Sequence, residues 1–525
     1  MFGWLFDARL GPSNRLIARW LFLRALAAIY FSAFYSLVFQ IHGLIGPEGI
    51  LPAQSYLHTV AQSLAHWERL WYAPSVLWMS SGSGMLSALC WIGMVASILI
   101  FLNLWPRGML AMCFVLFLSF VSTAQDFSSY QSDGMLLEAG FISLFFAPRG
   151  LRPGLGANRP PIRASLFLLR WEWFRIYFES GVVKLLSGDP QWRNFTAMDE
   201  YYQNGPLPTW IGWYAQHLPH WFHAGTVYAT LAMELGIVWM VFLPRRWRIV
   251  CFFIVTPWQI GVILTANYAF LNYLVLCMGI LLLDDGFLSY FVPANLKHRV
   301  QTPADSRMRA DSARSWPEVV RRSWQVAGLA VSAIMLTWIA YATTAEMMLL
   351  RVPLPRLPII ALEPFRIANQ YGLFAVMTRG RYEIEFQGSS DGENWIAYPF
   401  RYKPQALNEA PRIYAPYQPR FDWNLWFASL GSWRQYPLVP STELKLLSND
   451  KEVLKLFAGN PFSQQPPRQI RALLWQYWFT SMVEKRSTGM WWRRELLGLY
   501  APTIERTADG QIRVVEWPKS ESPHE

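Results

Sequence analysis

Long apolar runs separated by short polar loops fill the chain up to about residue 347. Runs close to the roughly 20 residues that cross the hydrocarbon layer of a bilayer predict about nine membrane helices. These runs lie at 16–39, 84–104, 109–124, 134–147, 164–187, 225–243, 249–266, 268–283 and 324–346. The pattern is typical of a multi-pass α-helical membrane protein.

After residue 347 the pattern becomes that of a soluble α+β domain. The proline-rich segment RVPLPRLP cannot continue the last apolar helix, because proline lacks the amide donor. Residues 381–388 and 395–402 alternate apolar and polar side chains around the turn sequence SSDGEN, which predicts a β-hairpin within a small sheet. Helices are predicted near 426–428, at 441–458 and at 468–485. We therefore expect a multi-helix transmembrane domain over 1–347 and a soluble domain over 348–525.

The basic residues in the loops predict the orientation of the chain. With the N-terminus inside, the inside loops hold clusters such as Arg245, Arg246 and Arg248, whereas the outside loops hold only Arg69 and Arg193. Positive residues concentrate on the cytoplasmic side of membrane proteins. An odd number of crossings then places 348–525 outside, in the periplasm of a bacterium or in the lumen of the endoplasmic reticulum. Residues 284–323 are predicted to form a basic cytoplasmic linker.

Composition narrows the classes of function. The net charge of +11 lies largely in short loops between apolar runs, so insertion topology and contact with membrane lipid explain it better than nucleic acid does. The four cysteines fall within apolar runs, which leaves no disulfide framework and no CxxC motif. GxSxG, GxxxxGK[ST] and GxGxxG motifs are absent from the sequence, and no cofactor is expected. Since no small-residue cleavage site follows 16–39, we expect a retained membrane helix there.

The run 164–187 is the least lipid-like of the predicted helices. Charges at membrane depth usually pair with each other or line a cavity. The expected intramembrane polar network consists of Arg170, Glu172, Arg175, Glu179, Lys184 and Glu234. Asp133, Glu138, Glu234 and Glu346 are candidate partners for its cations, with Glu234 and Glu138 first. One interpretation is structural pairing between helices, and the other is a polar site in which desolvation makes Lys184 a reactive base.

Three histidines in the loop before 225–243 invite a metal interpretation. His217, His220 and His223 recur every third residue in QHLPHWFH. Pro219 interrupts any helix that would align them, however, and no HExxH motif accompanies them. We therefore expect packing or hydrogen bonding by these rings rather than metal binding.

Several long segments of the chain form motifs that occur in a fixed order. They are 170–194, 201–210, NQYGLF at 369–374, GSSDGENWIAYPFRYKP at 388–404, YQPRFDW at 417–423, WFASL at 426–430 and GMWWRRELLGLYAP near the end. Together these segments resemble the lipase maturation factor family. The chain departs from the family pattern HQPRLDWxxWFAAL at Tyr417, Phe421 and Ser429. Within this segment we select a candidate client-contact or domain-organising site, formed by Gln418, Arg420, Asp422, Trp423 and Trp426.

The family resemblance implies a membrane-anchored factor that assists folding or assembly of an exported protein, with a lipase as one candidate client, rather than an enzyme. A second, local resemblance offers an alternative. Tyr177, Ser180, Gly181, Lys184 and Leu185 are spaced as in the membrane domain of vitamin K-dependent γ-glutamyl carboxylases, which implies Lys184 as a catalytic base. The turn GSSDGENW also resembles turns of carbohydrate-binding β-sandwiches, which implies a glycan- or envelope-binding module as a further alternative.

Overall fold

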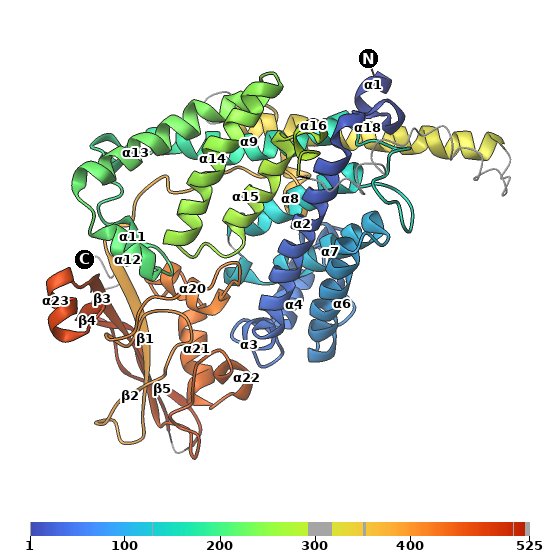
Figure 1. Ribbon diagram of the computed structural model, residues 1–525. Helices are drawn as coiled ribbons and strands as arrows, with labels where there is room; N and C mark the ends of the chain where they lie inside the picture. Colours follow the sequence, from blue (N-terminus) through green and yellow to red (C-terminus); the bar gives the residue numbers. More distant parts are fainter. Residues whose placement is uncertain (1, 129, 292–317, 350–352, 508, 520–525) are drawn as a thin grey trace.

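The computed structural model describes residues 2–128, 130–291, 318–349, 353–507 and 509–519. A bundle of helices makes up one end of the molecule, and a five-stranded sheet with its own helices makes up the other. Figure 1 shows the N-terminus at the top of the bundle and the sheet at the bottom left. The two ends are in contact through the helices and loops between them.

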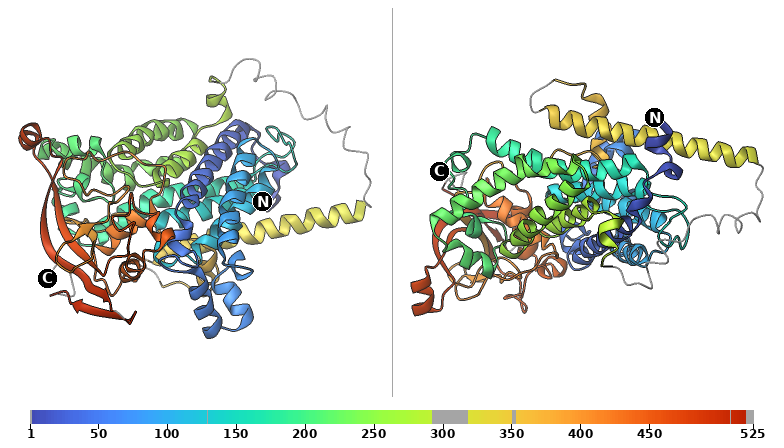
Figure 2. Two further views of the ribbon diagram at one scale, coloured as in Figure 1. Left: turned by 90° about the horizontal axis from the view of Figure 1, so that it is seen from below. Right: turned by 45° about the horizontal axis from the view of Figure 1, so that its top comes forward.

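Helices occur in every range that the apolar runs predict. They are α2 (Leu16–Val38), α6 (Ser83–Phe101), α7 (Pro106–Val121), α8 (Gln131–Phe146), α9 (Arg163–Leu186), α13 (His220–Leu235), α14 (Arg245–Thr265), α15 (Leu271–Gly279) and α18 (Glu318–Leu349). Figure 2 shows α18 along one side of the bundle, with its N-terminal end projecting beyond the other helices.

Among the described residues, five helices are long and apolar enough to cross a membrane. They are Ser13–Val38, Ser83–Phe101, His220–Phe242, Arg245–Thr265 and Val326–Met348. The apolar helices Pro106–Val121 and Leu271–Leu282 are shorter. The predicted multi-pass character is confirmed, whereas the predicted count of about nine crossings is not, because two apolar helices are short and both α8 and α9 carry charges.

Short helices connect the long ones. They are α1 (Phe2–Phe6), α3 (Ile41–Ile45), α4 (Ala53–Ser63), α5 (His66–Tyr72), α10 (Pro190–Arg193), α11 (Tyr201–Asn204), α12 (Trp210–Gln216), α16 (Asp285–Leu288) and α19 (Leu357–Ile360).

The first residues of the predicted linker 284–323 are fixed on the bundle. Asp285 accepts hydrogen bonds from the Leu16 and Ile17 amides at 2.7 and 2.9 Å, which caps the start of α2. Asp284 pairs with Arg245 at 2.6 Å. Residues 292–317 of this linker lie outside the described residues.

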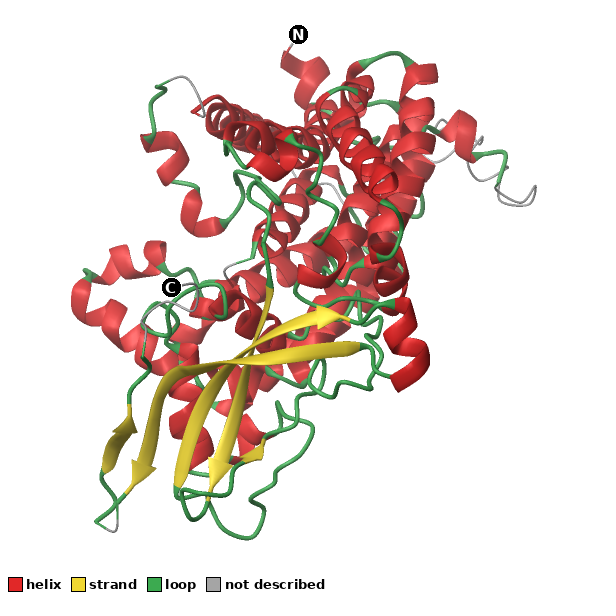
Figure 3. Ribbon diagram, turned by 90° about the vertical axis from the view of Figure 1, so that its left-hand side faces the viewer, coloured by secondary structure: helices red, strands yellow, loops and turns green. Residues whose placement is uncertain are grey.

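The C-terminal part is built on a sheet with strand order β2-β1-β3-β4-β5. The strands are β1 (Arg381–Ser389), β2 (Ile396–Ala397), β3 (Gln469–Phe479), β4 (Trp492–Arg506) and β5 (Ile512–Glu516). All neighbours are antiparallel, with Arg381 opposite Tyr477 and Phe479 opposite Trp492. Its helices are α20 (Arg420–Ala428), α21 (Leu438–Leu447), α22 (Lys451–Leu454) and α23 (Met482–Thr488). Figure 3 shows the twisted sheet with helices behind it.

The predicted hairpin is confirmed, although its second arm pairs only through β2. Asp391 closes the turn by accepting hydrogen bonds from the Glu393 and Asn394 amides at 2.9 and 2.8 Å. The predicted helix at 468–485 is wrong, because most of it is strand β3. Its side chains alternate between the two faces, and β1 and β4 satisfy the amides along both of its edges. The long apolar run therefore reflects a central strand, and the preceding prolines do not start a helix.

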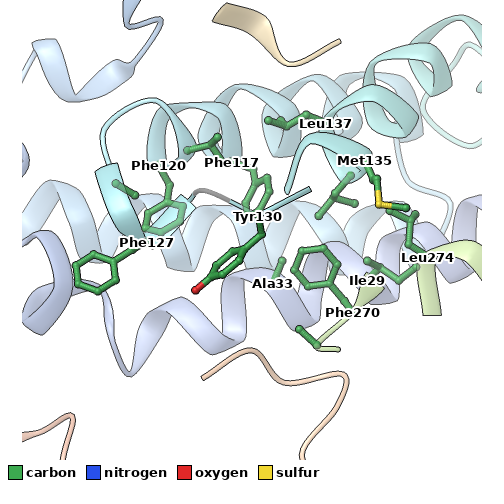
Figure 4. Packing of buried hydrophobic residues seen from close by; sticks show 14 of the residues in the cluster. Ile29, Ala33, Phe117, Phe120, Phe127, Tyr130, Met135, Leu137, Phe270 and Leu274 are labelled. Carbon is green, nitrogen blue, oxygen red and sulfur yellow. The ribbon is translucent and has the colours of Figure 1, made fainter. Parts of the chain in front are cut away.

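Among the described residues, the largest of four hydrophobic clusters runs from the bundle into the C-terminal part. Buried residues of α2, α7 and α8 belong to the same cluster as Phe421 of α20 and Ile470 of β3. Figure 4 shows its bundle portion, where Phe117, Phe120 and Phe127 lie near Tyr130. Because the core is continuous, the bundle and the C-terminal part hold each other in place.

Candidate functional site

The five candidate residues at 418–426 lie together on α20 and the turn before it, at the joint between the bundle and the C-terminal part. All five side chains are buried, and Gln418 and Arg420 have no exposed surface. Helix α20 begins directly after Pro419, with Asp422 in its first turn, where a negative charge is favourable. The structure therefore brings the predicted group together, in the interior and not on an open surface.

Arg420 links the C-terminal part to the bundle. Its guanidinium donates to both oxygens of Asp133 on α8, at 2.8 Å each, and to the Phe127 carbonyl at 2.7 Å. The Asp133 side chain is also fully buried. Two parallel hydrogen bonds to a carboxylate form the strongest geometry that an arginine offers. The partner of Arg420 is thus a residue of the bundle and not the nearby Asp422.

Gln40, just after α2, supports the same joint. Its amide nitrogen donates to the Gln418 carbonyl at 2.9 Å, and its oxygen accepts the Arg420 amide at 2.8 Å. Trp426 donates to the Asn204 carbonyl at 3.0 Å. In the described part of the chain, the Gln418 side-chain amide and the Trp423 indole nitrogen have no hydrogen-bond partner. Gln40 was not predicted, because a single glutamine at the end of an apolar run gives no local signal.

A cavity of about 580 Å³, which we call the joint cavity, lies beside these residues. Side chains from α2 and from 401–422 line it: Tyr35, Phe39, Gln40, Tyr402, Tyr414, Tyr417, Phe421 and Asp422. Of these lining residues, Tyr35 and Phe39 are exposed. The cavity therefore combines aromatic walls with one buried carboxylate.

Asp422 is the buried carboxylate among the residues that line this cavity. Its Oδ1 accepts the Tyr402 and Lys403 amides at 3.2 Å each. Burial raises the pKa of Asp422 to about 6, although these two amides act in the opposite direction. An aspartate in an unfolded chain has a pKa of about 3.9. The folded state therefore binds more protons than the unfolded state at pH values between these two pKa values.

Asp422→Asn is expected to flatten the dependence of stability on pH. In the wild type, ionising Asp422 lowers the free energy of unfolding by roughly 3 kcal/mol as the pH rises from about 4 to about 7. Asparagine keeps the acceptor oxygen and cannot ionise. When melting temperatures of the purified chain are measured between pH 4.5 and 7.5, the melting temperature of the variant should increase relative to that of the wild type as the pH rises. Parallel profiles would show that Asp422 does not titrate in this window.

The charged residues of α9 form two separate networks. Arg175 pairs with Glu138 of α8, lies 3.7 Å from Glu179, and donates to the Asn369 carbonyl at 2.6 Å. Lys184 donates to both oxygens of Glu234 on α13 at 2.9 Å and lies over the Trp192 ring. Glu138 and Glu234 are thus the partners of these two cations, as proposed from the sequence.

The remaining predicted members of the network are not connected to these pairs by hydrogen bonds. Arg170 donates to the Leu281 carbonyl at 2.9 and 2.6 Å. Glu172 is fully buried, and neither of its oxygens has a hydrogen-bond partner among the described residues.

The segment 366–378, which we call the connector, lies along α9 and supplies donors to buried carboxylates. Tyr371 donates its amide to Glu179 at 2.6 Å and its hydroxyl to Glu138 at 2.9 Å. The Asn369 amide donates to Glu138 at 3.1 Å, and the Met377 amide donates to Asp189 at 2.7 Å. The sequence does not predict the role of these connector residues, although Asn369 and Tyr371 lie in a stretch that carries the family resemblance.

The three histidines point to different partners. The ring nitrogens of His217 face the Trp213 and Thr480 carbonyls at 2.7 and 2.9 Å. His220 faces Asp199 at 3.0 Å, and His223 is buried next to the Tyr202 ring. Among the described residues there is no group of three or more side chains that could hold a metal ion. The rings contribute hydrogen bonds and packing around α12 and α13.

Comparisons with known proteins match both halves of the chain. The model of the lipase maturation factor transmembrane domain matches residues 17–290, and that of the lipase maturation factor C-terminal domain matches residues 367–502. Lipase maturation factor 2 of Gallus gallus is 31% identical over 595 residues, covering 94% of this chain and 82% of its own length. Lipase maturation factor 1 of Bos taurus is 30% identical over 534 residues, covering 98% and 94% respectively. No solved structure matches the chain. These matches, together with the membrane-length helices and the attached sheet, show that the chain belongs to the lipase maturation factor family.

Proposed function

We propose that this membrane maturation factor assists the folding or assembly of an exported lipase. The observation that carries the proposal is the joint, where buried contacts fix the C-terminal part on the bundle beside a cavity with aromatic walls. Its relatives are named for lipase maturation, and they match more than nine-tenths of this chain. A fixed domain can hold a client segment without itself rearranging.

Within this joint we assign two roles. The buried residues Gln418, Arg420, Asp422, Trp423 and Trp426 organise the contact with the bundle, because they have little surface to offer a client. The half-buried tyrosines of the joint cavity contact the client, since aromatic side chains are enriched at the centres of protein interfaces.

We propose that the chain acts without catalysis. The ammonium group of Lys184 is bound by both oxygens of Glu234 and is buried, which favours a structural cation over a free base. The relatives reported above give no support to the carboxylase or glycan-binding alternatives. Lys184 and Glu234 then hold α9 against α13.

The proposed topology places the N-terminus in the cytoplasm and 348–525 outside. About nine crossings, including the short helices, would account for the loop charges. The membrane domain then spans 1–347, and the outer domain faces the periplasm if the membrane is a bacterial inner membrane, or the lumen if it is that of the endoplasmic reticulum.

The experiment is quantitative proteomics of the exported fraction from host cells with and without this gene. Selective loss or aggregation of one lipase, with no missing modification, is the expected result. Re-expression of the Lys184→Arg variant should restore that lipase, because arginine keeps the cation beside Glu234.

Two outcomes would contradict the proposal. Normal abundance of all exported proteins with one missing mass increment would indicate an enzyme. If the Lys184→Arg variant accumulates at a normal level but does not restore the lipase, the result would support Lys184 as a catalytic base.

A further inference from the structure

A second cavity of about 580 Å³ lies at the end of the bundle away from the sheet, where α1, α2, α7, α18 and the loop 147–162 meet. Five arginines from four segments of the chain line it: Arg9, Arg19, Arg107, Arg149 and Arg159. We call it the arginine cavity. Its position is separate from the joint cavity and from the connector.

The arginine cavity carries positive charge without matching negative charge. The carboxylate that lines it is Asp7, and Arg9 already binds that group at 2.7 Å. Among the described residues, the other four arginines have no ion pair. Burial and then the nearby Arg159 lower the pKa of Arg149, which is the effect expected of cations held together without counter-ions.

Hydrogen bonds from the buried Arg19 hold the backbone of the cavity wall in place. Arg19 is buried and donates to the Leu155, Gly156 and Arg159 carbonyls at 2.7, 3.0 and 2.9 Å. Gly156 has a φ of +66°, and a Cβ there would lie 2.5 Å from the Arg19 guanidinium. The loop therefore closes around Arg19.

The start of the loop is held by another arginine. Arg107 donates to the Ala147 carbonyl at 2.8 Å. Together with the bonds of Arg19, this contact keeps Arg149 and Arg159 at the cavity.

The opposite side of the cavity is apolar and continues onto a membrane helix. Phe145 of α8 and Val326 and Leu329 of α18 line it. These α18 residues lie in the candidate span Val326–Met348, and the Val326 side chain is 60% exposed. An anionic head group beside the arginines would thus have a lipid-facing surface next to it for its acyl chains.

We propose that the arginine cavity binds the phosphate of an anionic phospholipid, whose acyl chains lie along α18. Guanidinium groups bind phosphate through paired, charge-assisted hydrogen bonds. Basic pockets between membrane helices are suited to lipid head groups. The neighbouring apolar surface distinguishes a lipid from a soluble phosphate compound. This site is independent of the client and of the proposed function.

The test uses the full chain, purified in a neutral detergent and analysed by native mass spectrometry while phosphatidylglycerol or phosphatidylcholine is added. The wild type should retain phosphatidylglycerol in preference to phosphatidylcholine. The double variant Arg149→Gln with Arg159→Gln should weaken phosphatidylglycerol binding by about tenfold or more, because each arginine near an anionic head group contributes to the affinity. Both side chains are exposed, so the fold should tolerate the change.

The matched control is Arg152→Gln with Arg246→Gln, which removes the same charge from exposed positions outside the cavity. This control variant should bind phosphatidylglycerol as the wild type does. In a separate competition, excess inorganic phosphate should not displace phosphatidylglycerol from the wild type.

An equal loss of phosphatidylglycerol binding in both double variants would show an effect of general surface charge only and would refute the site. Unchanged phosphatidylglycerol binding in the cavity variant would also refute it. Displacement by inorganic phosphate would assign the cavity to a soluble phosphate compound and overturn the lipid proposal.

Discussion

Arg420→Met should lower the free energy of unfolding by about 3–5 kcal/mol, because removing one partner leaves a buried charge uncompensated. The charge left behind is Asp133, whose side chain has no exposed surface. The Phe127 carbonyl also loses its donor. Thermal unfolding of the purified chain in detergent and the amount of chain in the membrane would measure the effect.

Two control variants separate this ion pair from a general loss of charge. Arg412 forms an exposed pair with Glu409 at 2.6 Å, and Arg412→Met should change stability by less than about 1 kcal/mol. Arg420→Met combined with Asp133→Leu should recover much of the loss, because apolar residues often replace a buried ion pair without cost. A single Arg420→Met variant as stable as the wild type would show that the pair does not stabilise the joint.

Arg175→Met is expected to have an effect of similar size, again about 3–5 kcal/mol, because it deprives a buried carboxylate of its cation. Arg175 contacts Glu138, Glu179 and the Asn369 carbonyl, so the substitution disturbs the bundle and the connector at once. Limited proteolysis should then cut near 366–378, in addition to the fall in melting temperature.

Arg170→Met on the same helix provides the comparison for Arg175. Arg170 donates only to the Leu281 carbonyl and has no ion pair among the described residues. Its replacement should cost about 1–3 kcal/mol, the penalty for one unsatisfied buried group, and should leave the connector protected. Equal effects on the connector in both variants would refute the specific role of Arg175.

Local features of the sequence predicted the elements of this fold well. Apolar runs located the long helices, and the turn chemistry of Asp391 and Gly392 located the hairpin. Strand β3 was predicted as helix because its neighbours β1 and β4 lie far from it in sequence, and only their pairing shows that it is a central strand. The composition of 468–485 alone does not separate a long buried strand from a helix.

The residues selected at 418–426 lie together in the structure, but the sequence does not predict their contacts with the bundle. Buried charge must find a partner, so Glu138 and Glu234 could be chosen for the cations of α9. Arg420 and Asp422 are neighbours in sequence, whereas the ion-pair partner of Arg420 is Asp133, which only the fold brings near. The connector contributes mainly backbone amides to these contacts. Because every residue except proline carries a backbone amide, no side-chain pattern in the sequence identifies the connector donors.

The connector also sets the order in which the protein can be completed during synthesis. Glu138, Glu179 and Asp189 emerge from the ribosome well before the amides of Asn369, Tyr371 and Met377 that bind them. A nascent chain that ends before residue 366 therefore holds α8 and α9 with acidic groups that still lack these donors. Maturation of the bundle and synthesis of the last third of the polypeptide become one event, so a truncated product keeps buried carboxylates without these donors.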